Sequence, residues 1–192
     1  MSDKKEIIRQ SAIVIFAKQG YFNTTTDQIA DHAGIAVGTI YNYFKNKQDI
    51  LEYIFTQEYE KRSKLFQEIM TKDQHTADKL MAIVKKHFDE VVDNPSLIKI
   101  MLYERQNAKN YSYKDSRLKE IFTHILEEGL RKGEIKKEIE PQIVSSFVFG
   151  SIEGIMRDYL EKYSLKNAEP KEFFDHAVHE LENFIKSGLL IK

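Results

Sequence analysis

Cysteine is absent from this chain of 192 residues, which excludes disulfides, thiol catalysis and cysteine metal sites and fits a cytoplasmic protein. Long hydrophobic runs are absent too, since the longest apolar stretch, residues 12–17, is far shorter than a membrane span. The N-terminal MSDKKE is charged, unlike a signal peptide. We therefore expect a cytoplasmic protein with no membrane partner.

The chain also lacks an excess of charge, because 29 Lys and Arg residues balance 30 Asp and Glu residues. This balance argues against a protein that coats nucleic acid non-specifically, and it is compatible with DNA binding through a small surface. The sequence has no HExxH motif, no P-loop and no Gly-rich dinucleotide turn. We therefore expect neither an enzyme nor a bound cofactor or metal ion.

Glycine and proline are scarce, at 8 and 3 residues, while helix-forming residues are plentiful. Pro95, Pro141 and Pro170 lie where helices can begin, and Gly20 and Gly133 lie where helices can end. Between these residues the apolar side chains recur at helical spacing, with no hairpin dipeptide. The sequence therefore predicts an all-α protein.

Residues 24–47, TTTDQIADHAGIAVGTIYNYFKNK, depart from the pattern of long helices. Thr25 or Thr26 can cap a short helix that ends at Gly34. A second short helix is expected from about Val37 to Phe44. Two short helices across a glycine turn form a helix-turn-helix unit. We therefore expect a DNA-binding domain at residues 1–47 and a second helical domain at residues 48–192.

The second short helix has the pattern of a DNA-reading helix, with Ile40 and Phe44 on its inner side. The amide of Asn42 can pair with adenine, and Thr39 can contact a base. The candidates for base or groove contact are Val37, Gly38, Thr39, Asn42 and Tyr43. The alternative is an ordinary helical hairpin that carries surface tyrosines.

The whole string distinguishes these alternatives: Phe16-Ala17-x-x-Gly20-Tyr21, Thr24-Thr25, Ile29-Ala30-x-x-Ala33-Gly34 and Gly38-Thr39-Ile40-Tyr41-x-Tyr43-Phe44-x-x-Lys47. It closely resembles the tetracycline-repressor (TetR) family of bacterial transcription regulators, without gaps over residues 5–52. The resemblance implies phosphate contacts by Thr25, Tyr41 and Lys47. It also implies that two recognition helices, related by a twofold axis, bind a palindromic double-stranded DNA operator. One position departs, because Ala36 replaces the usual capping serine.

The resemblance implies that the second domain binds an effector and forms a homodimer. Large flexible or aromatic side chains with a few polar groups are typical of a ligand pocket. For any one of them, ordinary core is the alternative, and for Arg105 a salt bridge is. The candidate pocket residues are Phe66, Met70, His87, Phe88, Met101, Tyr103, Arg105, Phe122, Met156 and Tyr159.

A stripe of small residues, Ser146, Gly150 and Gly154, lies on one side of the helix after Pro141. Such a stripe lets another helix approach closely. The resemblance implies that this helix and the last helix, which carries Ala177, Leu181 and Phe184, form half of an intersubunit four-helix bundle. The alternative is close packing inside one subunit.

Several shorter strings resemble the fatty-acid-responsive (FadR) branch of the family, among them Lys86-His87-Phe88, Arg105-Gln106 and Gly133-Glu134-Ile135-Lys136. This resemblance implies a repressor of fatty acid metabolism genes that long-chain acyl-CoA releases from DNA. The alternative within the family is a drug-responsive repressor of an efflux pump. An alternative of another class is a helical lipid carrier or interaction protein.

Overall fold

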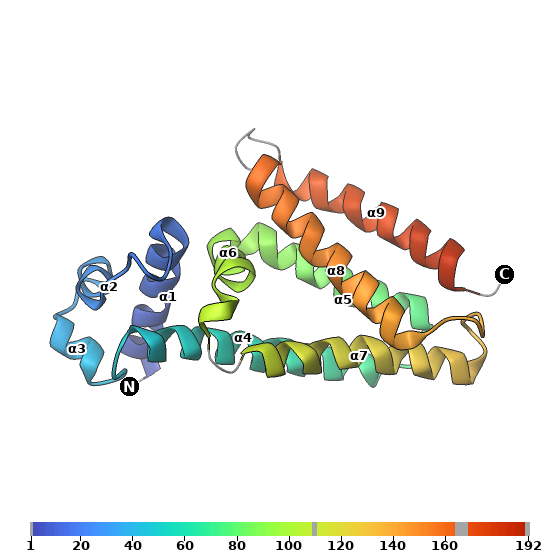
Figure 1. Cartoon of the computed structure of the whole chain (residues 1–192), viewed down its shortest axis with the longest axis horizontal. Helices are drawn as coiled ribbons and strands as arrows, with labels where there is room; N and C mark the ends of the chain where they lie inside the picture. Colours follow the sequence, from blue (N-terminus) through green and yellow to red (C-terminus); the bar gives the residue numbers. More distant parts are fainter. Residues whose placement is uncertain (1, 109–110, 164–168, 191–192) are drawn as a thin grey trace. The chain divides into compact units, whose positions relative to one another are not determined.

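The computed structural model describes residues 2–108, 111–163 and 169–190, and Figure 1 shows their helices. Within these residues no strand is present, and the only β-pairing is an isolated antiparallel bridge between Ile135 and Leu190. The all-α prediction is therefore confirmed. The elements are α1 (Ser2–Gln19), α2 (Thr26–Ala33), α3 (Val37–Tyr41), α4 (Lys47–Met70), α5 (Thr76–Asp93), α6 (Pro95–Tyr103), η1 (Arg105–Asn107), α7 (Tyr111–Lys132), α8 (Pro141–Asp158), η2 (Tyr159–Tyr163) and α9 (Pro170–Leu189).

The chain packs as two compact units, and each unit combines two separate segments of the sequence. The first consists of Met1–Lys61 with Asn94–Lys114, and the second of Arg62–Asp93 with Asp115–Lys192. These units differ from the domain boundary predicted at residue 47. The reason is that the first unit recruits the amino-terminal half of α4 and all of α6 to complete its core.

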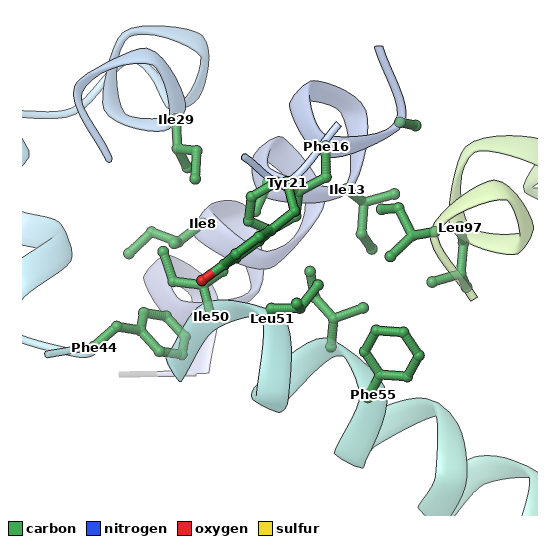
Figure 2. Close-up of a cluster of buried hydrophobic side chains, with 14 of the residues drawn as sticks. Ile8, Ile13, Phe16, Tyr21, Ile29, Phe44, Ile50, Leu51, Phe55 and Leu97 are labelled. Atoms are coloured by element: carbon green, nitrogen blue, oxygen red, sulfur yellow. The ribbon is translucent and has the colours of Figure 1, made fainter. Parts of the chain in front are cut away.

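The core of the first unit is a single cluster of buried apolar side chains, part of which is drawn in Figure 2. Helices α1 and α4 supply half of its buried members, and α2, α3 and α6 supply most of the others. Burial of these side chains is the main force that holds the three short helices in place. The members include Ile8, Ile13, Phe16, Ile29, Ile40, Phe44, Ile50, Leu51, Phe55, Leu97, Ile100 and Met101.

Local signals in the sequence set the helix ends as predicted. Thr25 caps α2 and forms a reciprocal capping box with Gln28. Asn94 accepts the backbone N–H of Leu97 at 3.0 Å, with Pro95 at the first position of α6. Gly34 ends α2 in the left-handed region, with φ of 65°. The sequence therefore predicted both ends of α2 and the start of α6.

The second unit is built from α5, α7, α8 and α9 with the carboxy-terminal part of α4. A side chain from beyond α7 caps α5, because Glu134 accepts the backbone N–H of Thr76 at 2.7 Å and its hydroxyl at 2.6 Å. Lys79 is buried and donates to Glu128 at 3.1 Å. These contacts fix α5 against α7, and α5 carries the central residues of the second core.

Candidate nucleic-acid interface and effector site

The amino end of α2 and the last residue of α3 meet on one exposed surface of the first unit. Thr25 is exposed, and its hydroxyl accepts the N–H of Gln28 at 3.2 Å. The hydroxyl of Thr26 lies 3.0 Å from that of Tyr41, whose side chain is 55% exposed. A helix amino end attracts anions, and hydroxyls can donate to phosphate oxygens. The geometry therefore suits a DNA phosphate beside α2.

The recognition helix α3 is shorter than predicted, because it ends at Tyr41 and the chain continues as a turn toward Phe44. Ala36 provides no side-chain cap at its start, as the sequence indicated. Ile40 and Phe44 are buried, which confirms the predicted inner side. Gly38 and Asn42 are exposed and Thr39 is half-buried, so a polar surface remains open to a DNA groove.

Two of the candidate groove residues also have a packing role. Val37 and Tyr43 are partly buried and pack against the core of the first unit. Their available contact surface is therefore smaller than that of Tyr41 or Asn42. Their assignment as groove contacts stays a prediction.

Lys47, predicted to contact phosphate, makes three contacts inside the first unit. Its ammonium donates to the backbone carbonyls of Tyr21 at 2.8 Å, Phe22 at 3.2 Å and Thr24 at 2.8 Å. It also lies 4.5 Å from the ring centre of Tyr21, a cation–π contact. A lysine ammonium has three donors, so a phosphate contact would require one of these hydrogen bonds to be exchanged. The phosphate assignment stays a prediction.

In the second unit, four rings from four helices meet in one cluster, in which three rings are buried and Phe149 is half-buried. Phe66 of α4 contacts His87 of α5 and Phe122 of α7, with ring centres 5.5 and 6.1 Å apart. Phe149 of α8 lies 6.5 Å from His87 and 6.0 Å from Phe122. Sequence reasoning named the first three as pocket residues and omitted Phe149, although it falls within the apolar pattern of α8.

His87 is the one polar ring of this cluster. Its Nδ1 lies 2.9 Å from the carbonyl of Ile83. Burial, aided by the nearby positive charge of Arg62, lowers the pKa of His87 to about 4. The imidazole is therefore neutral at pH 7 and belongs to an apolar environment.

A second aromatic group lies in the same unit. Phe88 stacks on Phe174 with ring centres 5.0 Å apart, and Tyr159 lies 4.8 Å from Phe174. Met156 is buried and Met70 is half-buried in this unit as well. Seven of the ten candidate pocket residues therefore belong to the second unit: Phe66, Met70, His87, Phe88, Phe122, Met156 and Tyr159.

The other three candidate pocket residues belong to the first unit. Met101 is buried in the core around α1 and α4, while Tyr103 and Arg105 are half-buried at the end of α6 and in η1. For Met101, packing in this core is therefore the role that the structure shows.

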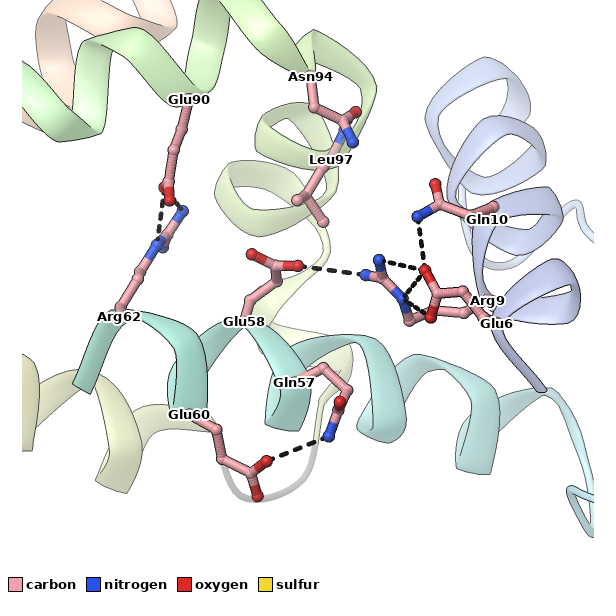
Figure 3. A network of polar contacts seen from close by, with 10 residues as sticks. All are labelled: Glu6, Arg9, Gln10, Gln57, Glu58, Glu60, Arg62, Glu90, Asn94 and Leu97. Atoms are coloured by element: carbon pink, nitrogen blue, oxygen red, sulfur yellow. Dashed lines mark hydrogen bonds and ion pairs between the residues drawn. The ribbon is translucent and has the colours of Figure 1, made fainter. Parts of the chain in front are cut away.

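Sequence reasoning missed a buried ion pair in the second unit. Arg62 donates to Glu90 through Nε at 3.1 Å, and both side chains are 8% exposed (Figure 3). No sequence signal indicated it, because an arginine on α4 and a glutamate on α5 are ordinary surface residues until the helices pack. It places a paired positive charge beside the aromatic cluster.

The predicted dimer stripe lies on an open face of α8. Ser146, Gly150 and Gly154 are exposed, and among the described residues no atom lies within 4 Å of a Cβ built on either glycine. The alternative of close packing inside one subunit is therefore wrong for both glycines. Phe147 of α8 is 53% exposed and lies 5.2 Å from the 48% exposed Phe184 of α9. Ala177 is half-buried and Leu181 is buried.

Two family models match nearly the whole chain. Residues 8–54 match the model of "Bacterial regulatory proteins, tetR family", and residues 55–175 match that of "YsiA-like protein, C-terminal region". This chain belongs to the TetR family. It is a transcriptional regulator with a helix-turn-helix, as the sequence predicted, and its relatives in these comparisons are regulators rather than enzymes.

The relatives of this TetR-family regulator include a fatty acid metabolism regulator protein of Bacillus subtilis. It is 29% identical over 166 residues, covering 82% of this chain and 86% of the relative. The fatty acid degradation regulator FadR of Bacillus halodurans has a similar fold, with a TM-score of 0.83, 23% identity and 94% of each chain covered. FadR of Bacillus subtilis, solved in complex with stearoyl-CoA, gives a TM-score of 0.79 at 26% identity, with 92% and 96% covered.

Across the residues that the structure describes, none of the helices of this TetR-family regulator combines the length and hydrophobicity that crossing a bilayer requires.

Proposed function

We propose that this TetR-family regulator is a cytoplasmic repressor of fatty acid metabolism genes. As a homodimer it binds a palindromic operator, and a long-chain acyl-CoA releases it. The observation that carries the proposal is the combination of the exposed α2–α3 surface with an aromatic second core, in a chain similar along most of its length to FadR regulators.

The DNA contacts follow from the exposed surface of the first unit. Thr25 and Tyr41 face a phosphate, while Thr39 and Asn42 face base edges, with Gly38 allowing close approach of the backbone. Val37, Tyr43 and Lys47 border this surface. Because the surface is small, high affinity requires two copies of it on one operator.

The dimer follows from the open face of α8 and α9. Ile143 is 68% exposed, and with Phe147 and Phe184 it surrounds the glycine stripe with apolar surface. Exposed apolar surface of this kind marks an interaction site. A second copy of the same face, related by a twofold axis, covers these side chains and places two α3 helices on one duplex.

The effector class follows from the second unit. An acyl chain needs apolar surroundings, which the two aromatic groups and Met70 and Met156 supply. Release from DNA requires that the effector bind the DNA-free conformation more tightly than the DNA-bound one. The relative solved with stearoyl-CoA supports an acyl-CoA over an apolar drug.

The test has two stages. Genomic DNA fragments that bind the purified protein are selected and sequenced, and binding to the recovered operator is measured by fluorescence anisotropy. We expect a palindromic site and a complex of two protomers per duplex by native mass spectrometry. Stearoyl-CoA at micromolar concentration then dissociates the complex, while free CoA and acetyl-CoA serve as controls for the headgroup. Release by apolar drugs, with no response to any acyl-CoA, would instead support the efflux-pump alternative.

A further inference from the structure

The turn between α1 and α2 is held by a carboxylate from the far end of α6. Glu104 Oε1 accepts the backbone N–H of Tyr21 at 3.0 Å, and both residues belong to the first unit. Gly20 lies in the left-handed region with φ of 81°, which favours glycine, and a Cβ there would lie 3.4 Å from Glu104 Oε1, at van der Waals contact. The turn and the carboxylate therefore fit each other closely.

A closed circuit of hydrogen bonds continues from this contact. Glu104 Oε2 accepts from the side-chain amide of Asn107 at 2.7 Å, and the Asn107 carbonyl accepts from Gln48 at 2.7 Å. Gln48 in turn accepts the hydroxyl of Tyr21 at 2.7 Å. Tyr21 is thus fixed at its backbone N–H and at its hydroxyl by the same circuit.

The position of Tyr21 determines where the DNA-facing surface begins. Lys47 binds the carbonyls of Tyr21 and Thr24, so residues 21–24 move together with the start of α4. The next residue, Thr25, caps α2, and Thr26 contacts Tyr41. A change in the turn at Tyr21 is therefore transmitted over a few residues to the hydroxyls that face phosphate.

From this geometry we propose that Glu104 is a positioning residue for DNA binding. It holds the turn at residues 20–24 so that the amino end of α2 and Tyr41 face the operator together. It lies outside residues 8–54, which match the DNA-binding family model. The inference rests on the proposed DNA-binding function and adds to it a residue that does not touch DNA.

Electrostatics makes an opposite prediction, which sharpens the test. A carboxylate near DNA repels phosphates, so removing its charge alone would tighten binding. Glu104→Gln removes the charge and keeps an acceptor for the Tyr21 N–H, while the Asn107 amide can turn its oxygen toward the new NH₂ group. Glu104→Ala removes charge and acceptor, and Glu104→Asp keeps the charge but shortens the reach.

The experiment measures affinity for the selected operator by fluorescence anisotropy at several salt concentrations, at a temperature where circular dichroism shows each variant folded. We expect Glu104→Ala and Glu104→Asp to bind about tenfold more weakly, as loss of the acceptor for the Tyr21 N–H predicts. Glu104→Gln is expected to stay within about twofold of wild type, and the salt slope is expected not to change. Asp31→Ala, which removes an exposed carboxylate of α2, is the charge control.

Hydrogen–deuterium exchange of the full chain without DNA adds a readout that is independent of the operator. Glu104→Ala and Glu104→Asp are expected to speed exchange at residues 20–25, and Glu104→Gln is not. If Glu104→Ala does not fold, the Asp and Gln variants carry the comparison.

Equal operator affinity in all three variants, or tighter binding by both Ala and Gln, would overturn the positioning role. A lower melting temperature with unchanged affinity would overturn it as well. Failure of the wild-type protein to bind any selected duplex is a different result, because it removes the proposed DNA-binding function itself.

Discussion

Acidification is expected to destabilise this protein through one buried histidine. The pKa of His87 is lowered from its ordinary value of 6.5 to about 4 in the folded state. Unfolding returns the imidazole to water, so the unfolded chain binds a proton between these two values that the folded chain does not. Stability is therefore highest above pH 6.5 and falls as the pH drops toward 4.

The magnitude follows from the difference between the two pKa values. Each pKa unit corresponds to about 1.4 kcal/mol of the free energy of unfolding. The full shift of the His87 pKa therefore contributes about 3 kcal/mol, of which about 2 kcal/mol is lost at pH 5. His87→Phe keeps a ring against Phe66 and Phe149 and removes the titrating group. Between pH 7 and pH 5, the free energy of unfolding of this variant is expected to fall by about 2 kcal/mol less than that of the wild type.

The assay is urea unfolding followed by circular dichroism at half-unit steps from pH 7.5 to pH 4.5. His124→Gln, which replaces a histidine whose side chain is 61% exposed, controls for the mere loss of a histidine. The free energy of unfolding of each variant is compared with that of the wild type at each pH. The contribution of the carboxylates to the pH dependence then cancels, because all three proteins share them. Parallel curves for wild type and His87→Phe would refute the buried, neutral state of His87.

Three further predictions concern other parts of the molecule. Asn42→Ala is expected to weaken operator binding by about 1–3 kcal/mol with little effect on random DNA, and anisotropy titrations that show equal losses would contradict base readout. Among the described residues, a Cβ at Gly150 has no neighbour within 4 Å. Gly150→Leu is therefore expected to raise the dimer dissociation constant at least about tenfold without lowering monomer stability. Sedimentation that shows an unchanged dimer would exclude this face as the dimer interface. Arg62→Met leaves the buried Glu90 without its arginine and is expected to lower the free energy of unfolding in urea by about 3 kcal/mol. Adding Glu90→Leu is expected to restore most of this loss. No recovery in the double variant would contradict the buried ion pair.

Features that depend on near neighbours in sequence were predictable from the chain alone. The cap at Thr25, the turn at Gly34 and the inward side of Ile40 each follow from residues a few positions apart. The length of the recognition helix was overestimated, because the helical spacing of apolar residues continues to Phe44 while the backbone leaves the helix after Tyr41. A side chain can keep its inward direction in the turn that follows a helix, so periodicity alone does not locate the end.

Features that depend on tertiary packing were not predictable in the same way. The contact between Glu104 and Tyr21 joins residues that are far apart in the chain, and nothing near either residue signals it. Lys47 fits the phosphate pattern of the family in sequence, yet its three carbonyl partners are visible only once the turn is folded. Met101 has a large flexible side chain, which is typical of a ligand pocket, but it lies in the core of the first unit.

The interleaving of the two units has a consequence for synthesis on the ribosome. The core of the first unit needs Leu97, Ile100 and Met101, so its helix-turn-helix cannot close when residue 61 has been made. At about 5–20 residues per second, roughly 2–8 s pass before this part of α6 is complete. During that interval the core of the first unit lacks the side chains of α6, while residues 62–93 of the second unit are being made. The DNA-binding unit is thus encoded first and completed late, and a nascent chain that stops before α6 carries the reading helix on an incomplete core.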